Sequence, residues 1–199
     1  KIDLLPVISS HPKYEIYNGN QLSNYLFIGS NSDSNVASLV WFLSYCWLDI
    51  RKVIPNLRLF IAGRVCFNRD VRKTINDLEL ASKGLRICNE VNDLSELYAS
   101  CGVIIAPNIR GTGMKVKVIE ALSYAKIIVG TRIAFEGINV KHNFNVYIAN
   151  TPKTFIKSCL EASTNNTNLT MKINAYKLWN KDHSFLSGIK KLKEIFKIK

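Results

Sequence analysis

Short apolar runs alternate with segments of helical periodicity along most of this chain, and this alternation is the feature that most restricts its fold. Strands are expected at residues 26–28, 57–62, 85–88, 103–106, 127–131 and 146–149. Helices are expected between them, at residues 35–54, 71–81, 94–100, 113–124 and 152–162. Such an alternation favours a parallel sheet that is covered by helices on both faces. The sequence therefore predicts an α/β fold, a doubly wound Rossmann-like domain.

The expected helix boundaries carry residues that stop or cap helices. Pro55 follows the first helix, Asp93 stands where it can cap the short helix 94–100, and Pro152 fits the first position of a helix. We divide the chain into a linker-like segment at residues 1–24, a Rossmann-like domain at 25–165 and basic, amphipathic helices at 166–199.

The composition is that of a globular protein with a substantial core, because 47% of the 199 residues are apolar and 21% are charged. Five cysteines stand singly inside apolar runs, and only three histidines accompany them. This pattern predicts buried, reduced thiols and argues against a zinc site. No signal peptide opens the sequence, and its longest apolar stretch, residues 36–48, is too short and interrupted to span a bilayer. We expect a cytoplasmic protein.

The net charge of +12 has three candidate explanations. The first is AT-rich coding, which adds lysine without selection by a partner and is indicated by the abundance of lysine, asparagine and isoleucine. The second is a polyanionic partner, and the third is an anionic membrane surface. Residues 171–199 hold eight lysines against Asp182 and Glu194. They also predict an apolar helical stripe, made of Phe185, Ile189, Leu192, Ile195 and Phe196. The first interpretation is that this stripe docks on the domain, and the second is contact with the inner face of a membrane.

Residues 107–122 combine two glycines, three cations and a glutamate where a strand ends and a helix begins. Backbone N–H groups and the positive end of the helix dipole would point out of this loop, so Gly111, Gly113, Lys115 and Lys117 predict a phosphate cradle with Glu120 behind it. In the plainer interpretation the glycines only shape a turn and the lysines are solvated. The spacing matches neither a dinucleotide fingerprint nor a P-loop.

In a doubly wound sheet the ligand lies beyond the carboxyl ends of the strands, so the loops there should form the site. They contain a polar, mostly cationic set suited to a phosphorylated ligand, namely Ser30, Arg64, Arg110, Thr112 and Glu136. No Ser/His/Asp set, close carboxylate pair or metal-binding cluster is visible in these loops. The three histidines fall outside them, and we expect these histidines on the surface.

Several ordered motifs resemble the C-terminal, nucleotide-sugar-binding domain of GT-B glycosyltransferases, more narrowly glycosyltransferase family 4. The resemblance covers about residues 25–159. Its opening motifs are Phe27-Ile-Gly-Ser30 and Val40-Trp-Phe-Leu43, and the middle one is Val91-Asn-Asp-Leu94. Residues 107–121 resemble a Pro-Leu-Arg-x-Gly-x-Gly-x-Lys-x-Lys-x-x-Glu-Ala run, and residues 131–137 a Thr-x-x-Ala-x-Glu-Gly motif.

The resemblance implies how the donor is held. In the family's Glu-x7-Glu pattern the second glutamate holds the ribose hydroxyls of the donor, and the resemblance places this glutamate at Glu120. The first glutamate of the pattern would fall at Thr112. Residues 91–94 would meet the base through their backbone, and Lys115 and Lys117 would stabilise the leaving diphosphate. Residues 30–35 lack the Arg and Lys that many members carry there. The candidate substrate-binding residues are Gly29, Ser30, Arg64, Val91, Leu94, Arg110, Gly111, Thr112, Gly113 and Glu120.

The function implied by the resemblance is metal-independent, retaining transfer of a sugar in polysaccharide biosynthesis. The donor would be a UDP-, GDP- or ADP-sugar, and the acceptor, a glycan or a lipid-linked acceptor, would be bound by an N-terminal domain that this chain lacks. Two other functions remain open. A non-catalytic binding or regulatory module is suggested by Thr112 and the missing cations, and a charge-driven polyanion binder by the net charge. No nucleic-acid motif appears, and no nucleic-acid partner is expected.

Overall fold

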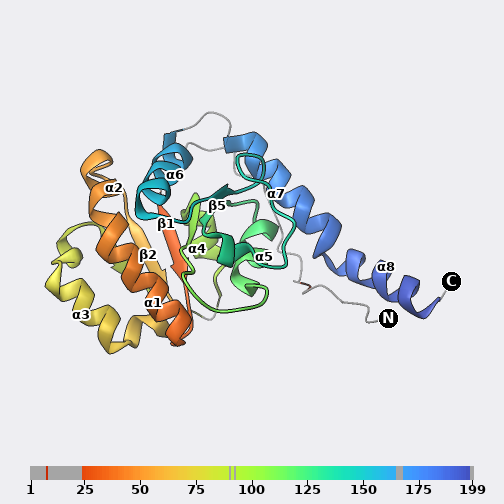
Figure 1. The fold of residues 1–199 in the computed structure, drawn as a ribbon, viewed down its shortest axis with the longest axis horizontal. Coiled ribbons are helices and arrows are strands. Elements are labelled where there is room, and N and C mark those ends of the chain that lie inside the picture. Colours follow the sequence, from red (N-terminus) through yellow and green to blue (C-terminus); the bar gives the residue numbers. More distant parts are fainter. Residues whose placement is uncertain (1–7, 9–23, 90, 92, 165–167, 198–199) are drawn as a thin grey trace.

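The computed structural model describes residues 8, 24–89, 91, 93–164 and 168–197, and these form a six-stranded sheet between two helical layers (Figure 1). The strands are β1 (Tyr25–Ile28), β2 (Leu59–Ala62), β3 (Leu85–Ile87), β4 (Val103–Ala106), β5 (Ile127–Gly130) and β6 (Tyr147–Ile148). They are all parallel, in the order β3-β2-β1-β4-β5-β6. The strand order reverses direction between β1 and β4. The predicted doubly wound fold is confirmed.

Helices cover both faces of the sheet. One layer contains α1 (Asp33–Phe42), α2 (Leu48–Val53), α3 (Arg69–Asp77) and α6 (Pro152–Thr164). The other contains α4 (Ser95–Ser100), α5 (Val116–Ser123) and α7 (Asn168–Asp182). Because successive strand residues point to opposite faces, each strand feeds two cores. In β4, Val103 and Ile105 join the first core while Ile104 and Ala106 join the second.

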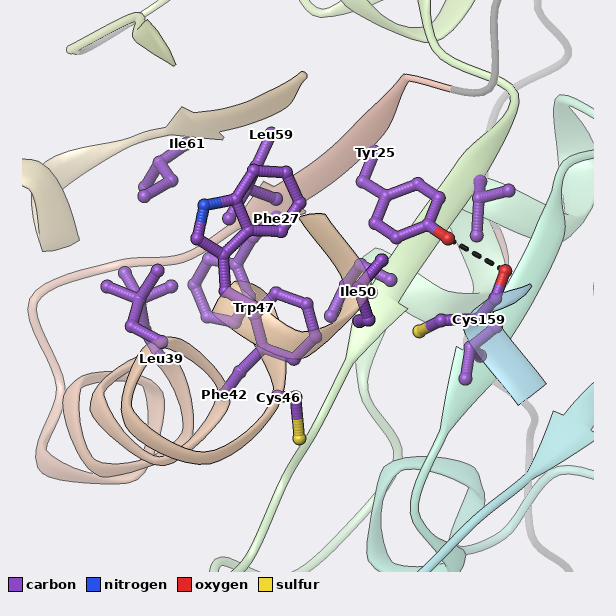
Figure 2. Close-up of a cluster of buried hydrophobic side chains, with 14 of the residues drawn as sticks. Tyr25, Phe27, Leu39, Phe42, Cys46, Trp47, Ile50, Leu59, Ile61 and Cys159 are labelled. Atoms are coloured by element: carbon purple, nitrogen blue, oxygen red, sulfur yellow. Dashed lines mark hydrogen bonds between the residues drawn. The ribbon is translucent and has the colours of Figure 1, made fainter. Parts of the chain in front are cut away.

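The first core is rich in aromatic rings (Figure 2). Trp47 lies in a π-helical turn, η1 (Leu43–Trp47), that joins α1 to α2, and it packs edge-on against Tyr25 with centroids 6.3 Å apart. Phe42 packs against Phe155 of α6 at 5.7 Å. The buried hydroxyl of Tyr25 donates a hydrogen bond to the carbonyl oxygen of Cys159 at 2.7 Å. These contacts fix α1, α2 and α6 on β1.

Some element boundaries differ from those predicted. The helix predicted at 113–124 begins at Val116, because Gly111 and Gly113 have φ of +101° and +76° and Lys115 is extended. The helix predicted at 71–81 ends at Asp77, and a short turn, η3 (Leu80–Ser82), follows. The N-cap position of α4 is occupied by Leu94, one residue after the predicted Asp93. Oδ1 of Asp93 still accepts from the N–H of Ser95, the first residue of the helix, at 2.8 Å.

The two C-terminal helices behave differently. Ala175, Leu178 and Trp179 of α7 are buried in the second core, whereas α8 (Phe185–Phe196) continues past the end of α7, away from the sheet (Figure 1). The docking interpretation is wrong for Phe185 and Phe196, which are 64% and 66% exposed, because α8 has only α7 as a substantial neighbour among the described elements. The rest of the predicted stripe, Ile189, Leu192 and Ile195, is half-buried.

The remaining expectations concern segments and residue classes. Apart from Ile8 and Asn24, the linker-like segment predicted at 1–24 lies outside the described residues, and the division into 25–165 and 166–199 stays a prediction. All five cysteines are free thiols; Cys88 is half-buried, and the other four, Cys46, Cys66, Cys101 and Cys159, are buried as expected. Among the described residues, no helix combines the length and apolar character that crossing a membrane requires.

Candidate functional site

The loops that follow β1 and β4 meet at the point where the strand order reverses. The Ser34 hydroxyl donates to the carbonyl oxygen of Arg110 at 2.6 Å, and Nη2 of Arg110 donates to the carbonyl oxygen of Asp33 at 3.1 Å. A Cβ added to Gly111 would lie 2.8 Å from Oγ of Ser34. Glycine therefore fits position 111 for its left-handed φ and for this close approach. The two loops form one continuous rim at the carboxyl edge of the sheet, where ligands of doubly wound folds bind.

Lys117 joins α5 to the end of β1 and to the first turn of α1. It lies in the first turn of α5, and its ammonium donates to the carbonyl oxygen of Ile28 at 3.2 Å and to Oδ1 of Asn35 at 2.9 Å. The same Nζ lies 4.6 Å from the ring centroid of Phe27. Burial, with the charge of Lys115 as a second cause, lowers the pKa of Lys117 to about 8. Among the described residues no carboxylate pairs with it, so the site holds a poorly solvated cation.

Asn35 links this cation to the loop after β1. Its Nδ2 donates to Oγ of Ser30 at 3.0 Å and to the carbonyl oxygen of Ser30 at 3.3 Å, while its Oδ1 accepts from Lys117. The predicted residues Ser30 and Lys117 are thus brought together by a residue that was not predicted as part of the site. A periodicity analysis could not find this contact, because positions 35 and 117 are 82 residues apart.

Lys115 is directed to the other side of β4. It is the N-cap residue of α5, and its Nζ donates to the carbonyl oxygen of Gly113 at 2.5 Å and lies 3.9 Å from Oε2 of Glu136. Glu136 follows η4 (Arg132–Phe135), the turn after β5. Since β1 and β5 flank β4, the two lysines are held on opposite sides of the N-terminus of α5.

Glu120 faces α4 from the second turn of α5. The hydroxyl of Tyr98 donates to Oε2 of Glu120 at 3.3 Å, and the Tyr98 ring stacks on Tyr124 with centroids 4.2 Å apart and an interplanar angle of 12°. Burial raises the pKa of Glu120, and the hydrogen bond from Tyr98 partly offsets this rise. One carboxylate oxygen is thereby oriented while other acceptor positions stay available. The two tyrosines were not predicted, and no motif marks them.

The other predicted site residues lie around this edge. Gly29 directly follows β1, and its carbonyl oxygen accepts from the N–H of Val65 at 3.1 Å. Arg64 is exposed at the start of η2 (Arg64–Phe67), after β2. Val91 and Leu94 are half-buried before α4, and Thr112 is exposed in the loop after β4. The site therefore spans the loops after β1 to β5, and its cations come from more than one of them.

Asn108 is a further polar residue of the loop after β4. It is 1% exposed, and its Oδ1 is buried without a hydrogen-bond partner among the described residues. Its carbonyl oxygen accepts from the hydroxyl of Thr131 at 2.5 Å, which ties the loop to the end of β5.

A pocket of about 440 Å³ lies on the β5 and β6 side of the same loop. It is lined by Gly111, Thr112, Arg132, Glu136, Ile133, Phe135, Ile138, Val140 and Ile148. Within the described ranges, no group of three or more His, Cys, Asp or Glu side chains could hold a metal ion.

The expectation of surface histidines is wrong for His183, which is 3% exposed because it follows the well-packed α7; His142 is exposed, and His11 lies outside the described residues.

Comparisons with known proteins agree with this geometry. The sequence model of the glycosyl transferases group 1 family matches residues 23–165. A Klebsiella pneumoniae relative, named an uncharacterized 44.6 kDa protein in the cps region, is 27% identical over 168 residues. That alignment covers 81% of this chain and 42% of the relative.

Two solved structures show the same fold. The pneumococcal O-GlcNAc transferase GtfA, in complex with UDP and GlcNAc, has a TM-score of 0.77 at 15% identity, over 99% of this chain and 39% of that chain. Anabaena Alr3699/HepE, in complex with UDP and glucose, has a TM-score of 0.72 at 12% identity, over 90% of this chain and 49% of that chain. The chain spans less than half of the length of each protein that it matches here.

Proposed function

The chain belongs to the glycosyl transferases group 1 family, and from this premise we propose that it is the donor-binding part of a glycosyltransferase. The donor is a UDP-, GDP- or ADP-sugar, and the sugar passes with retention of its anomeric configuration to a glycan or lipid-linked acceptor of polysaccharide biosynthesis. We assign the acceptor to a second Rossmann-like domain, because the chain spans less than half of the length of its matched relatives.

The observation that carries this proposal is the cation of Lys117 at the point where the strand order reverses. An ammonium that is buried away from a carboxylate costs free energy, which a bound anion would recover. It contacts the end of β1 and Asn35 of α1, and it lies at the N-terminus of α5, whose free N–H groups also favour an anion. A diphosphate that lies across Ser30 and Gly111 to Gly113 would neutralise this cluster. Lys117 thus supplies, from α5, the positive charge that residues 30–35 lack.

The same groups support a role in catalysis. When the bond between the sugar carbon and the diphosphate oxygen breaks, negative charge grows on the diphosphate. Lys115, Lys117 and the backbone N–H groups of the loop are fixed in place to stabilise it. Arg110 holds the loop against α1, and Arg64 adds charge to the rim. Because lysines supply this charge and the sequence has no Asp-x-Asp motif, we propose that the reaction needs no metal ion.

The nucleoside is assigned to the α4 side of the loop. Glu120, oriented by Tyr98, accepts hydrogen bonds from the ribose hydroxyls, and residues around Val91 and Leu94 meet the base through their backbone. A half-buried carboxylate with one donor among the described residues has the acceptor capacity that a pair of ribose hydroxyls requires.

Calorimetric titration with UDP, GDP and ADP tests the proposal. At least one of them should bind with a dissociation constant below 1 mM, which corresponds to about 4 kcal/mol. The corresponding nucleoside serves as the control and should bind much more weakly. A failure of all three to bind would instead favour a non-catalytic module that keeps only the fold.

We also propose that the protein works in the cytoplasm, with α8 in peripheral contact with an anionic membrane. Four exposed lysines of this C-terminal segment, Lys190, Lys191, Lys193 and Lys197, support the contact. Exposed Phe185, Leu186 and Phe196 on the same helix would add apolar insertion at the headgroup level.

A further inference from the structure

The side chain of Asn35 is held in place by its own helix and by the end of β1. Asn35 is the third residue of α1, and its backbone N–H donates to Oγ of Ser32, the N-cap residue, at 3.4 Å. A Cβ added to Gly29 would lie 3.2 Å from Cβ of Asn35 and 3.3 Å from its Cγ. The glycine after β1 therefore leaves just enough room for the Asn35 side chain, and the amide group is a fixed feature of the site.

The partners of Asn35 define which way its amide points. An ammonium is a donor only, so the amide oxygen faces Lys117 and the amide NH2 faces Ser30. Lys117 uses two of its three N–H groups on protein, one on Asn35 and one on the carbonyl oxygen of Ile28. In the described part of the chain, its third N–H has no hydrogen-bond acceptor.

The hydroxyl of Ser30 is oriented by the same amide. Its oxygen accepts from Nδ2 of Asn35 at 3.0 Å, so its own proton is directed away from the amide. Ser30 is exposed, and no acceptor for that proton is found among the described residues. One O–H donor and one charged N–H donor are thus left available, and a single amide group connects them.

We propose that Asn35 is a positioning residue that aligns the ammonium of Lys117 and the hydroxyl of Ser30 on one diphosphate. The inference rests on the proposed function, because it takes the diphosphate to lie beside Ser30. Asn35 acts through its two neighbours and not through a contact of its own. A neutral amide suits this role, because it accepts from the cation without cancelling the charge that a diphosphate needs.

A simpler role for Asn35 would be to fasten the loop after β1 to α1, since Nδ2 also donates to the carbonyl oxygen of Ser30 at 3.3 Å. The two roles predict different effects when the side chain is removed. Loss of a fastener would disturb the whole site and weaken binding of the nucleoside and of its diphosphate alike. Loss of a positioning residue weakens only the diphosphate, and the loss depends on Ser30.

The test uses titration calorimetry with UDP, GDP and ADP, each paired with its nucleoside. In Asn35→Ala the diphosphate that the wild-type protein binds most tightly should bind about tenfold more weakly, while its nucleoside stays within about twofold. Ser30→Ala should weaken the diphosphate by about fivefold in the wild-type background. It should have little further effect in Asn35→Ala, because the losses of coupled groups are not additive.

The variant Asn35→Asp supplies a readout that a fastener would not move. The pKa of Lys117 is about 8, and only Lys115 acts on it among the charged groups of α1, α5 and the loop after β4, which are Asp33, Arg110, Lys115 and Glu120. A carboxylate at position 35 would raise this pKa, because an opposite charge favours the ammonium. Aspartate also suits the first turn of a helix, so α1 should remain folded.

The two pH profiles should then differ. Wild-type affinity for the diphosphate falls above pH 8, where Lys117 loses its proton. Asn35→Asp should bind the diphosphate more weakly than Asn35→Ala at pH 7, because the new carboxylate neutralises Lys117 and repels the ligand. Its remaining affinity should stay constant up to pH 9.5, since the ammonium keeps its proton there.

A matched control is Asn68→Ala. The Asn68 amide also contacts the loop after β1, since its Nδ2 donates to Oδ1 of Asn31 at 2.8 Å, but its Oδ1 caps α3. This variant should lower the unfolding temperature, because a helix cap is lost, and should leave both affinities within about twofold.

Three outcomes would overturn the inference. They are equal losses for nucleoside and diphosphate in Asn35→Ala, additive losses in the double variant with Ser30→Ala, and a wild-type pH profile in Asn35→Asp. If no diphosphate binds the wild-type protein at all, the proposed function fails together with the inference. If the wild-type protein and both Asn35 variants bind a diphosphate equally well, the inference alone fails.

Discussion

At the scale of single residues, the site is defined by contacts between side chains that are far apart in the chain. Lys117 meets Asn35 across 82 positions, and Tyr98 meets Glu120 across 22. The sequence motif around residues 107–121 was sufficient to select Lys117 and Glu120, because glycines, lysines and a helix start imply an anion site. It could not show their partners, because no local pattern records which segments the sheet brings together. The roles of both residues stay predictions.

The titration of Lys117 leads to a prediction about pH. Its pKa is lowered to about 8, so the ammonium is charged below that pH and neutral above it. Nucleoside diphosphate affinity should therefore fall above pH 8, by about tenfold per pH unit where binding requires the proton. Calorimetry between pH 6.5 and 9.5 would measure this. The bare nucleoside should show no such dependence, and Lys117→Gln should bind diphosphate weakly at every pH. An unchanged pH profile in the variant would remove Lys117 from the site.

The prediction for Glu120 uses a change in the ligand as its control. Glu120→Ala should lose about 1.5–3 kcal/mol of nucleoside diphosphate affinity, because a carboxylate that accepts from ribose hydroxyls makes charge-assisted hydrogen bonds. The wild-type protein should prefer the ribose ligand over its 2′-deoxy form, and the variant should not distinguish them. Tyr98→Phe, which only loosens the carboxylate, should lose less. Normal discrimination in Glu120→Ala, with an unchanged circular dichroism spectrum, would contradict the assignment.

At the scale of elements, periodicity predicted the type and order of nearly all strands and helices. A short run that is apolar on both faces, such as β4, is typical of a parallel sheet covered by helices on both sides, and the chain contains several such runs. This is why the order of the elements could be predicted. The ends of elements were less predictable. The left-handed Gly111 and Gly113 delay α5 to Val116, and Glu79, also left-handed, ends the α3 region. The apolar stripe predicted in α8 indicated a helix with one apolar face. A pattern within one helix cannot tell whether that face contacts the domain or a membrane.

For α8, we predict binding to anionic vesicles. The three exposed lysines of α8 and Lys197, which directly follows it, should each contribute about 1 kcal/mol near a negatively charged surface. Sedimentation with phosphatidylserine-containing vesicles should recover the protein, whereas neutral phosphatidylcholine vesicles should not. Changing Lys190, Lys191, Lys193 and Lys197 to Gln should abolish binding. The matched control changes the same number of exposed lysines elsewhere, Lys52, Lys73, Lys153 and Lys157. Equal losses in the two variants would show that only net charge matters and that α8 is not the contact.

At the scale of the whole molecule, structural support and chemistry occupy different parts of the sheet. The buried aromatic residues of the first core and the packed helices of the second hold the strands, and the candidate site lies on the loops at their carboxyl edge. Of the two C-terminal helices, α7 supports the fold and α8 does not. α7 contributes Met171 to the first core and Trp179 to the second, whereas α8 contributes no residue to either.

This difference predicts the effect of two truncations. A chain that ends after residue 183 lacks α8 and should unfold at nearly the same temperature as the full chain, since exposed side chains such as Phe185, Leu186 and Phe196 contribute about 0.5 kcal/mol or less. A chain that ends after residue 164 also lacks α7 and should not fold. Removing Trp179 alone, in Trp179→Ala, should already cost about 3–5 kcal/mol, a large part of the stability of a domain. Thermal unfolding followed by circular dichroism would measure all three variants. If the loss of α8 lowered the unfolding temperature as much as Trp179→Ala does, the helix would belong to the folded core, and its assignment as a membrane contact would have to be abandoned.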